Sequence, residues 1–336
     1  MSLRKVLPWC ETPAPVHHAG RLVEVKPFTS SGCRSRLLGK DPFHAVSPRA
    51  WVLFILSSII WGVPYLFIKV AVDANVPPAF VAWSRIALAA ALLVPLAWHR
   101  GALRGLRGRA GAIVGYAACE VAVPFVLIAV GERYITSSLA AILVATMPLL
   151  VALLSMRLSP ADRPTGRRLL GLVIGFGGVV ALLGVDVAGR PGELLGAAMV
   201  LLATLGYAIA PIIVSRYLTD LDPLGPVAAS LTVAAIALLP AALATPPHRM
   251  PGPAALASIV VLGVICTALG LVVFFRLITE VGPSRASVIT YVNPVVAVVI
   301  GVLALAERLG SMSIAGLLLI LGGSWLSTDG RASSTH

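Results

Sequence analysis

Charged residues are scarce in this sequence. Only 12% of its 336 residues are charged, 58% are hydrophobic, and the mean hydropathy is +0.94. A soluble domain has about a quarter charged residues, so this chain has too few of them to cover a globular surface. It also lacks the alternating segments of about ten residues that build a transmembrane barrel. Helices remain as the elements able to cross a bilayer, because a helix satisfies its own backbone hydrogen bonds.

The residues of common catalytic and metal sites are missing from the apolar parts of the sequence. None of the four cysteines belongs to a Cys-x-x-Cys pair, and none of the six histidines lies inside an apolar run. There is no Gly-x-x-x-x-Gly-Lys loop, and no two carboxylates share one face of an apolar run. We therefore expect no cofactor, no metal and no direct use of ATP. A membrane-embedded transferase is kept as a distant alternative.

The formal net charge of +12 comes from basic residues in the first 49 positions and in short loops. No soluble basic domain is present to form a nucleic-acid surface, so we exclude nucleic acid as a partner. If the N-terminus is cytoplasmic, the inside loops hold about eleven Lys and Arg and the outside loops about five, the asymmetry of the positive-inside rule. We expect a multi-pass protein of the cell (plasma) membrane with both termini in the cytoplasm.

Ten apolar runs of about 20 residues are long enough to cross about 30 Å of hydrocarbon at 1.5 Å per residue. A proline-rich tail, residues 1–49, precedes them. We predict that this tail is disordered and cytoplasmic, or else an extension beyond the native start, and that residues 328–336 form a C-terminal tail. The predicted spans are 51–71, 79–98, 110–130, 136–156, 168–186, 193–214, 224–244, 254–276, 286–306 and 312–327.

Several landmarks recur in the second half of the chain at nearly one shift. The pairs, 146 or 147 positions apart, are Pro148 and Pro294, Trp61 and Tyr207, and Cys119 and Cys266. The shift divides the sequence into two repeats, residues 50–187 and residues 191–327, with five predicted helices each. An odd number of helices inserts the two repeats with opposite topology, as in many transporters. We therefore predict an all-α integral membrane fold of ten transmembrane helices in two inverted five-helix repeats.

Short motifs in both repeats resemble one family. They are Ile60-Trp61-Gly62 with Lys69, Trp83-Ser84-Arg85 and Arg133-Tyr134 in the first repeat, and Gly282-Pro283-Ser284-Arg285, Asn293-Pro294 and Ala306-Glu307-Arg308-Leu309 in the second. Together they resemble the drug/metabolite transporter superfamily, and within it the ten-helix transporters of the EamA type. The sequence departs from that pattern at Asp162-Arg163-Pro164, where Glu-Arg-Leu is usual, and at Tyr207, where Trp is common.

Glu120 is the charge within the predicted spans that most needs an explanation. It lies about 15 Å into its helix, near the bilayer midplane, where a carboxylate costs about 2.5–3.5 kcal/mol on insertion scales. One interpretation is a proton-coupling or cation-binding group that faces a central cavity. The alternative is a neutral Glu in a structural hydrogen bond. Arg85, about 9 Å into its helix, either meets an anionic substrate group, pairs with Glu120, or extends to the outer interface.

Other polar and aromatic groups at similar depth are candidates for the walls of a substrate site. Prolines inside apolar runs free backbone carbonyls, and broken helices supply such groups to transporter sites, although a kink needed only for packing explains them as well. The candidate helix breaks or hinges are Pro64, Pro148 and Pro294, and the candidate substrate or coupling residues beside Glu120 and Arg85 are Trp61, Tyr207, Tyr291, Asn293 and Thr146.

Charged elbows follow the fourth and ninth predicted spans. They are Asp162 with Arg163, and Glu307 with Arg308. Each is interpreted either as a gate whose ion pair opens during transport or as a local ion pair that fixes the turn. Interfacial pairs are partly hydrated and cheap to keep, which favours the local role.

The resemblance implies a secondary transporter that exports a small metabolite, an amino acid or a drug-like solute by alternating access. Its partners are then a small-molecule substrate and the lipid bilayer. Glu120 makes coupling to protons the simplest mechanism. An uncoupled facilitator or uptake permease is the close alternative, and the chain is not expected to be an enzyme.

Overall fold

The computed structural model describes residues 47–158, 166–184 and 190–328, and the side chains of 155–158, 283–284 and 328 are not described. These residues form helices joined by turns, and they contain no β-strand. Most of the predicted N-terminal tail, the first elbow with Asp162 and Arg163, and residues 329–336 lie outside the described part of the chain.

In the first half of the chain, the described residues form nine helical elements between Pro48 and Leu182. Two of them, α2 and α3, are separated only by Val63, and η2 is a π-helical segment between two α-helices. The elements are α2 (Pro48–Gly62), α3 (Pro64–Asp73), α4 (Pro78–His99), α5 (Ala110–Tyr116), η2 (Ala117–Ala122), α6 (Val123–Gly131), α7 (Ser137–Val144), α8 (Met147–Leu158) and α9 (Arg167–Leu182).

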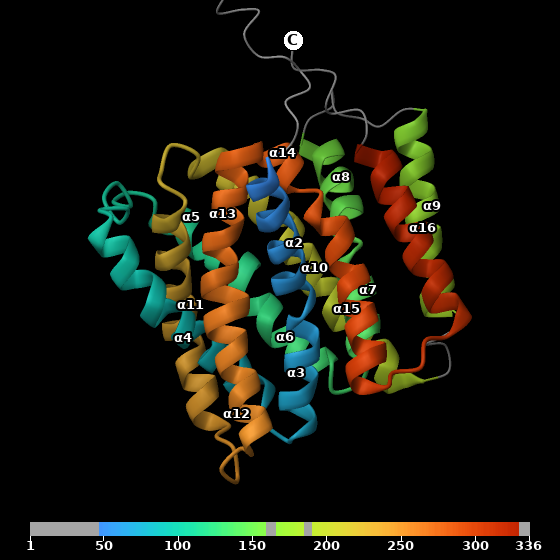
Figure 1. Ribbon diagram of the computed structural model, residues 1–336, viewed down its shortest axis with the longest axis horizontal. Coiled ribbons are helices and arrows are strands. Elements are labelled where there is room, and N and C mark those ends of the chain that lie inside the picture. The colour runs from blue at the N-terminus through green and yellow to red at the C-terminus, as the bar shows by residue number, and fades with distance from the viewer. Residues whose placement is uncertain (1–46, 159–165, 185–189, 329–336) are drawn as a thin grey trace, which may run out of the picture. The chain divides into compact units, whose positions relative to one another are not determined.

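The second half has a similar order of long helices and also contains a π-helical segment. The elements are α10 (Pro191–Tyr217), α11 (Leu224–Ala244), α12 (Pro253–Val260), η5 (Val261–Leu269), α13 (Gly270–Val281), α14 (Pro283–Ala286), α15 (Ile289–Leu305) and α16 (Ser311–Thr328). In Figure 1 the described chain begins with α2 and ends with α16 at the same end of the bundle. We call this end the Pro48 face and the opposite end, where α3 stops, the Asp73 face.

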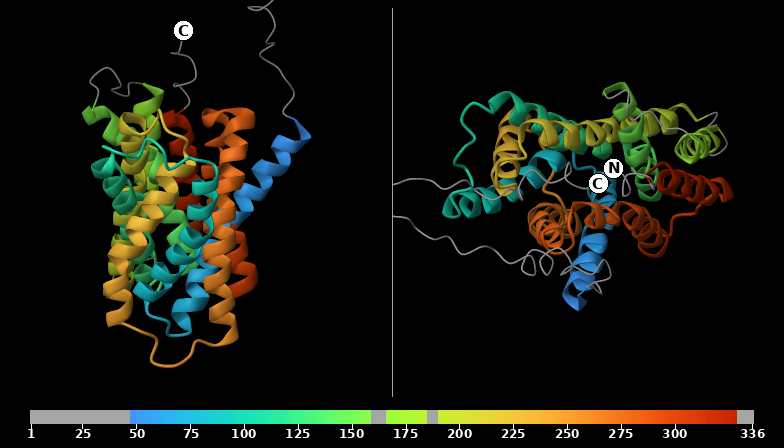
Figure 2. Two further views of the ribbon diagram at one scale, coloured as in Figure 1. Left: turned by 90° about the vertical axis from the view of Figure 1, so that its left-hand side faces the viewer. Right: turned by 90° about the horizontal axis from the view of Figure 1, so that it is seen from above.

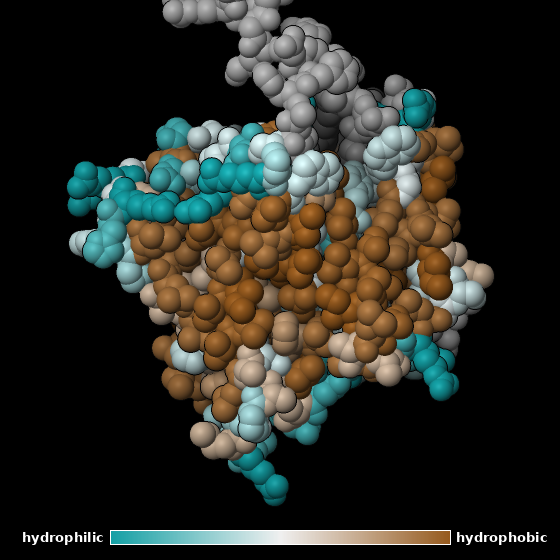
Figure 3. Space-filling model, in the orientation of Figure 1, coloured by the Kyte–Doolittle hydropathy of each residue, from teal (hydrophilic) through white to brown (hydrophobic). Residues whose placement is uncertain are grey.

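Seven helices or runs of joined helical elements in the described chain are long and apolar enough to cross a membrane, and α15 and α16 are shorter apolar helices. Large apolar side chains are exposed on many of the helices, including Val180 at 70%, Leu243 at 70% and Leu303 at 79%. Figure 3 shows this as a broad hydrophobic surface, with hydrophilic residues gathered towards the two ends. An exposed apolar surface of this extent is what a bilayer covers.

Helices from the two halves pack against each other in pairs. The pairs are α4 with α11, α9 with α16, α7 with α15, α6 with α10, and α2 with α13. The contact between α9 and α16 depends on glycine: a Cβ atom at Gly323 would lie closer than 3.0 Å to backbone atoms of Gly171 and Gly175. Small residues let two helix backbones approach closely in a membrane.

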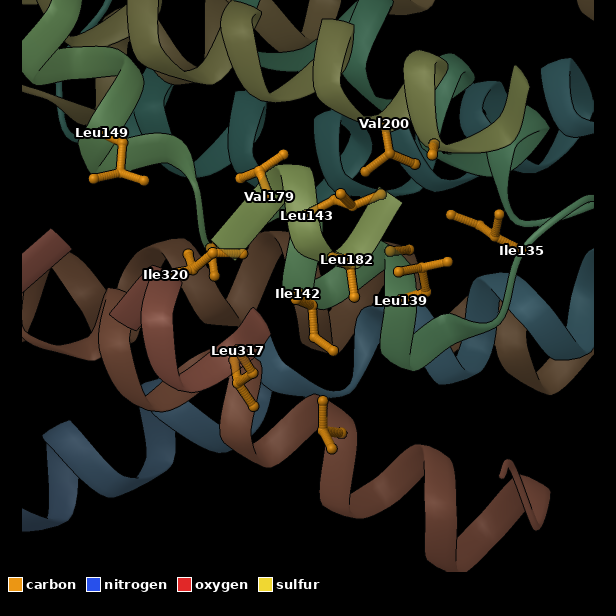
Figure 4. Close-up of a cluster of buried hydrophobic side chains, with 14 of the residues drawn as sticks. Ile135, Leu139, Ile142, Leu143, Leu149, Val179, Leu182, Val200, Leu317 and Ile320 are labelled. Carbon is orange, nitrogen blue, oxygen red and sulfur yellow. The ribbon is translucent and has the colours of Figure 1, made fainter. Parts of the chain in front are cut away.

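A buried hydrophobic cluster joins several of these pairs. Leu143 of α7, Leu149 of α8, Leu182 of α9 and Ile320 of α16 are all fully buried within it, and Val200 of α10 packs beside them. Figure 4 shows these side chains converging from separate helices. The cluster therefore ties the second part of the first half to the second half of the chain.

The predicted helix breaks are only partly present. Val63 separates α2 from α3, which begins at Pro64, and Figure 2 shows α2 inclined relative to its neighbours. A break also separates α7 from α8 at residues 145–146, two positions before Pro148. Pro294, in contrast, lies inside the continuous helix α15, and the break is upstream, before Ile289. Proline removes one hydrogen bond, and packing on neighbouring helices can hold the backbone helical around it.

Candidate functional site

A cavity of about 440 Å³ lies inside the bundle, with walls from both halves of the chain. The sequence-predicted residues that line it come from α2, α3, α4, η2, α8, α10 and α15. They are Trp61, Pro64, Arg85, Glu120, Pro148, Tyr207, Asn293 and Pro294. The fold thus brings together most of the candidate residues around one space.

The cavity ends before the Asp73 face. Ile68 of α3 and Ile128 of α6 line its end on that side, and they are only 3% and 4% exposed. Both belong to a hydrophobic cluster in which residues of α4, α10 and α12 also take part. On the other side, lining residues such as Val227 and Ser230 lie in the first two turns of α11, near the Pro48 face. The cavity is therefore closed towards Asp73 and extends towards Pro48.

Arg85 lines the cavity as a buried guanidinium that is 8% exposed. Its Nε donates a hydrogen bond to Oγ1 of Thr267 at 2.8 Å, and its Cζ lies 3.9 Å from the centroid of the Phe125 ring. A hydroxyl and an aromatic face hold the group without neutralising it. Among the described residues no carboxylate lies within ion-pair distance of Arg85, so the pair with Glu120, one of the three alternatives for this residue, is not formed in this structure.

Glu120 is half-buried in η2 and lines the same cavity. Within the described ranges it has neither a hydrogen-bond partner nor an ion-pair partner, so no structural hydrogen bond explains it. Thr267, 147 positions later, lies in η5 and also lines the cavity. The two π-helical segments thus occur at corresponding positions of the two halves. Single π-helical turns within α-helices are frequent at functional sites.

Two predicted site residues do not reach the cavity. Thr146 is 1% exposed and donates its hydroxyl hydrogen to the backbone carbonyl of Leu143 at 2.7 Å. The hydroxyl of Tyr291 donates to the carbonyl oxygen of Ser324 on α16 at 3.5 Å. Asn293 does line the cavity, and its buried Oδ1 accepts no hydrogen bond from the described residues.

Glu307, in the second elbow, bonds to the start of α7. Its carboxylate accepts hydrogen bonds from the backbone N–H groups of Ser137 at 2.8 Å and Ser138 at 3.0 Å, and from both serine hydroxyls. A carboxylate is favoured at a helix N-terminus, where N–H groups lack intrahelical partners. In the described part of the chain Glu307 and Arg308 form no ion pair. The elbow is thus attached to the other half of the protein.

Glu132 is a buried acid that sequence analysis missed. It follows α6 directly and is 0% exposed, and neither carboxylate oxygen has a hydrogen-bond partner among the described residues. Its backbone carbonyl accepts a hydrogen bond from Nζ of Lys69 at 2.8 Å, and Lys69 also pairs with Asp73 at 3.1 Å. The only sequence signal is an acid at the end of an apolar run, which is also typical of an exposed turn.

Apolar helices long enough to cross a bilayer surround a cavity that, among the described residues, is lined by one arginine and one glutamate, as in a multi-pass membrane protein. The model of the EamA-like transporter family matches residues 49–184 and again residues 194–328. The chain belongs to the EamA-like transporter family.

Individual relatives agree with this assignment. An uncharacterized transporter of Archaeoglobus fulgidus is 27% identical over 83% of this chain and 98% of its own length. The uncharacterized inner membrane transporter YedA of Escherichia coli K12 is 28% identical over 77% of this chain and 83% of its length. The uncharacterized transporter YvbV of Bacillus subtilis is 26% identical over 81% and 89%. One crystal structure shares the fold, with a TM-score of 0.60 at 18% identity over 83% of this chain and 96% of that one.

Proposed function

We propose that this protein is a secondary active transporter that exports a small solute by alternating access. The observation that carries the proposal is the 440 Å³ cavity between two copies of one family unit. Inverted-repeat transporters bind their substrates at such an interface and open it to one side at a time. The family and the relatives are those of transporters, which argues against an enzyme.

The membrane topology proposed here has ten spans in two inverted five-helix repeats. The seven long helices are completed by α9, α15 and α16. The packing of corresponding helices, such as α4 with α11 and α9 with α16, supports a pseudo-symmetric pair of repeats. Arg104, Arg107 and Arg109 lie in the turn between α4 and α5, at the Pro48 face, so the positive-inside rule favours the cytoplasm on that side. Both termini are then cytoplasmic, in the cell membrane.

Arg85 restricts the class of solute. Its guanidinium lines the cavity, and no carboxylate among the described residues neutralises it. An unneutralised guanidinium favours a substrate that carries an acidic group. The aromatic side chains of Trp61, Phe125 and Tyr207 also line the cavity. They favour a substrate whose acidic group is attached to an apolar part. Among metabolites, amino acids and drug-like solutes, the site therefore favours those with a carboxylate or a similar anion.

Glu120 supplies the coupling in this proposal. It has no partner within the described ranges and faces the cavity, so it is free to take up a proton on one side and release it on the other. Exchange of protons for solute drives export against a gradient. An uncoupled facilitator or uptake permease is the alternative, in which Glu120 binds a cationic group of the solute.

Transport through this cavity is tested with the purified protein in proteoliposomes, using labelled amino acids, nucleosides and cationic dyes. Leu271 of α13 lines the cavity, whereas Leu269, the last residue of η5 in the same span Pro253–Val281, is 45% exposed. Leu271→Trp fills the cavity and should abolish transport of any solute that the wild type carries. Leu269→Trp is the matched control and should retain it. Equal transport by both variants would place the pathway elsewhere.

A further inference from the structure

We propose that Glu132 is a proton-binding site whose occupation holds the Asp73 face of the transporter closed. The proposal rests on the alternating-access function given above. It concerns a different group from Glu120, because Glu132 does not line the cavity. The ligand is a single proton, which Glu132 takes from water on the Asp73 side before that side closes.

The burial of Glu132 is complete because the helices around it are tightly packed. The preceding residue, Gly131, faces α10 so closely that an added Cβ would lie 2.9 Å from the carbonyl oxygen of Gly196. Ser137, at the start of α7, is 1% exposed. Ile128, four residues before Glu132, lines the cavity and belongs with Ile68 to a buried hydrophobic cluster. The Glu132 carboxyl is therefore shielded from bulk water in this conformation.

The neighbouring charges do not neutralise Glu132. Nζ of Lys69 is held by the backbone carbonyl of Glu132 and by the Asp73 carboxylate. Glu307 is held by Ser137 and Ser138. Arg85 donates to Thr267 instead. Each nearby cation thus has other partners, and no donor among the described residues reaches either oxygen of Glu132.

Glu132 follows the last residue of the span Ala110–Gly131. Burial raises the pKa of its carboxyl well above the usual range. Lys69 and Arg85 lower the pKa of Glu132, whereas Glu307 and Asp73 raise it further, and burial is the largest of these influences. The charged acid would have to leave water without a compensating hydrogen bond, which is costly. The neutral acid is therefore the form that fits the closed face.

Closure takes up one proton, and reopening releases it. The open face exposes Glu132 as a carboxylate, which takes one proton from water on that side and becomes the neutral acid as the helices close. Reopening returns the proton to water on the same side. A metal ion is a poorer occupant, because no group of three or more His, Cys, Asp or Glu side chains converges among the described residues. Closure should then be favoured at low pH and lost as the pH rises.

The experiment measures opening of the Asp73 face without any substrate. Val72 of α3 is 5% exposed at that face, whereas Met250, in the turn between α11 and α12, is 88% exposed. Each is replaced by Cys in full-length protein whose four native cysteines are changed to Ala, and the protein is placed in lipid nanodiscs. The labelling rate of V72C by a hydrophilic maleimide is divided by that of M250C at each pH. This ratio removes the intrinsic pH dependence of the thiol and reports opening.

We expect the ratio to rise with pH by up to about tenfold per unit, the limit for release of one proton. Glu132→Gln, a neutral isostere, should give a low ratio that does not change with pH. Glu132→Asp should restore the rise, which a purely structural role would not require. Glu193→Gln removes a partly exposed carboxylate at the start of α10 and should behave like the wild type.

A ratio that stays flat in the wild type, or that still rises in Glu132→Gln, would overturn the proposal. Neither result depends on transport, so failure to find a transported solute is distinguishable from failure of the proton site. Monodisperse elution of each variant in gel filtration shows that it is folded.

Discussion

Nε of Arg85 on α4 donates a hydrogen bond to Oγ1 of Thr267 in η5, 2.8 Å away. The only arginine that lines the cavity, among the residues described, is thus oriented by a hydroxyl from the other half of the chain. Thr267 in turn donates to the backbone carbonyl of Leu262 at 2.8 Å, five residues earlier in the π-helical segment. The irregular backbone of η5 therefore fixes both the hydroxyl and the cation that depends on it.

Thr267→Val should weaken binding of acidic solutes while leaving neutral solutes unaffected. The substitution keeps the shape of the side chain and removes one hydrogen bond to Arg85, which is worth about 1 kcal/mol or about fivefold in affinity. The measurement is competition by acid and amide forms of the same solute in the transport assay. Thr232→Val is the matched control, because the Thr232 hydroxyl donates to the carbonyl of Ala228 within its own helix. Equal loss of competition by the acid and the amide form would mean that Thr267 affects only the fold.

Gly323→Ala should lower thermal stability, and Gly322→Ala should not. An added Cβ at Gly323 meets the backbone of α9 closer than 3.0 Å, whereas one at Gly322 meets nothing within 4 Å. Overpacking of a rigid contact costs about 1–3 kcal/mol. The test compares the melting temperatures of the two variants in the same detergent. Replacing glycine by alanine raises helix propensity equally at both sites, so a difference between the variants reports the contact with α9. Equal melting temperatures would show that α9 and α16 do not pack as described.

Glu307→Ala should destabilise the protein by about 2–3 kcal/mol, the cost of removing a charged acceptor from buried donors. Two N–H groups and two hydroxyls at the start of α7 lose their acceptor. The measurement is the unfolding midpoint in denaturant. Glu193→Ala removes a partly exposed ion pair with Arg190 and should change the midpoint little. A midpoint for Glu307→Ala equal to that of Glu193→Ala would contradict the contact with α7.

Hydropathy was sufficient to place most of the helices. The predicted span 224–244 coincides with α11, and the span 79–98 differs from α4 by one residue at each end. Apolar runs of this length have few alternatives to a helix. Cys119 and Cys266 are 147 positions apart, as are Glu120 and Thr267, but only Glu120 was singled out from the sequence.

Other features left little trace in the sequence. A π-helical segment such as η2 differs from an α-helix only in which carbonyl each N–H reaches, so composition does not reveal it. Thr146 and Tyr291 do not line the cavity: the Thr146 hydroxyl bonds to the carbonyl of Leu143, three residues earlier, and the Tyr291 hydroxyl bonds to the carbonyl of Ser324 on α16. The sequence around Glu132 is typical of an exposed turn, because hydropathy depends only on residues nearby in the chain. The burial of Glu132 comes from packing against α10 and α7, which are distant in sequence.

The most direct test of the central claim is export from proteoliposomes with and without an imposed proton gradient. The wild type should accumulate its solute against a concentration gradient only while the proton gradient exists, and an ionophore should abolish this. Glu120→Gln should still exchange solute down its gradient but lose the response to protons. Accumulation by Glu120→Gln equal to that of the wild type would contradict coupling at Glu120, and wild-type transport that ignores the proton gradient would identify a facilitator.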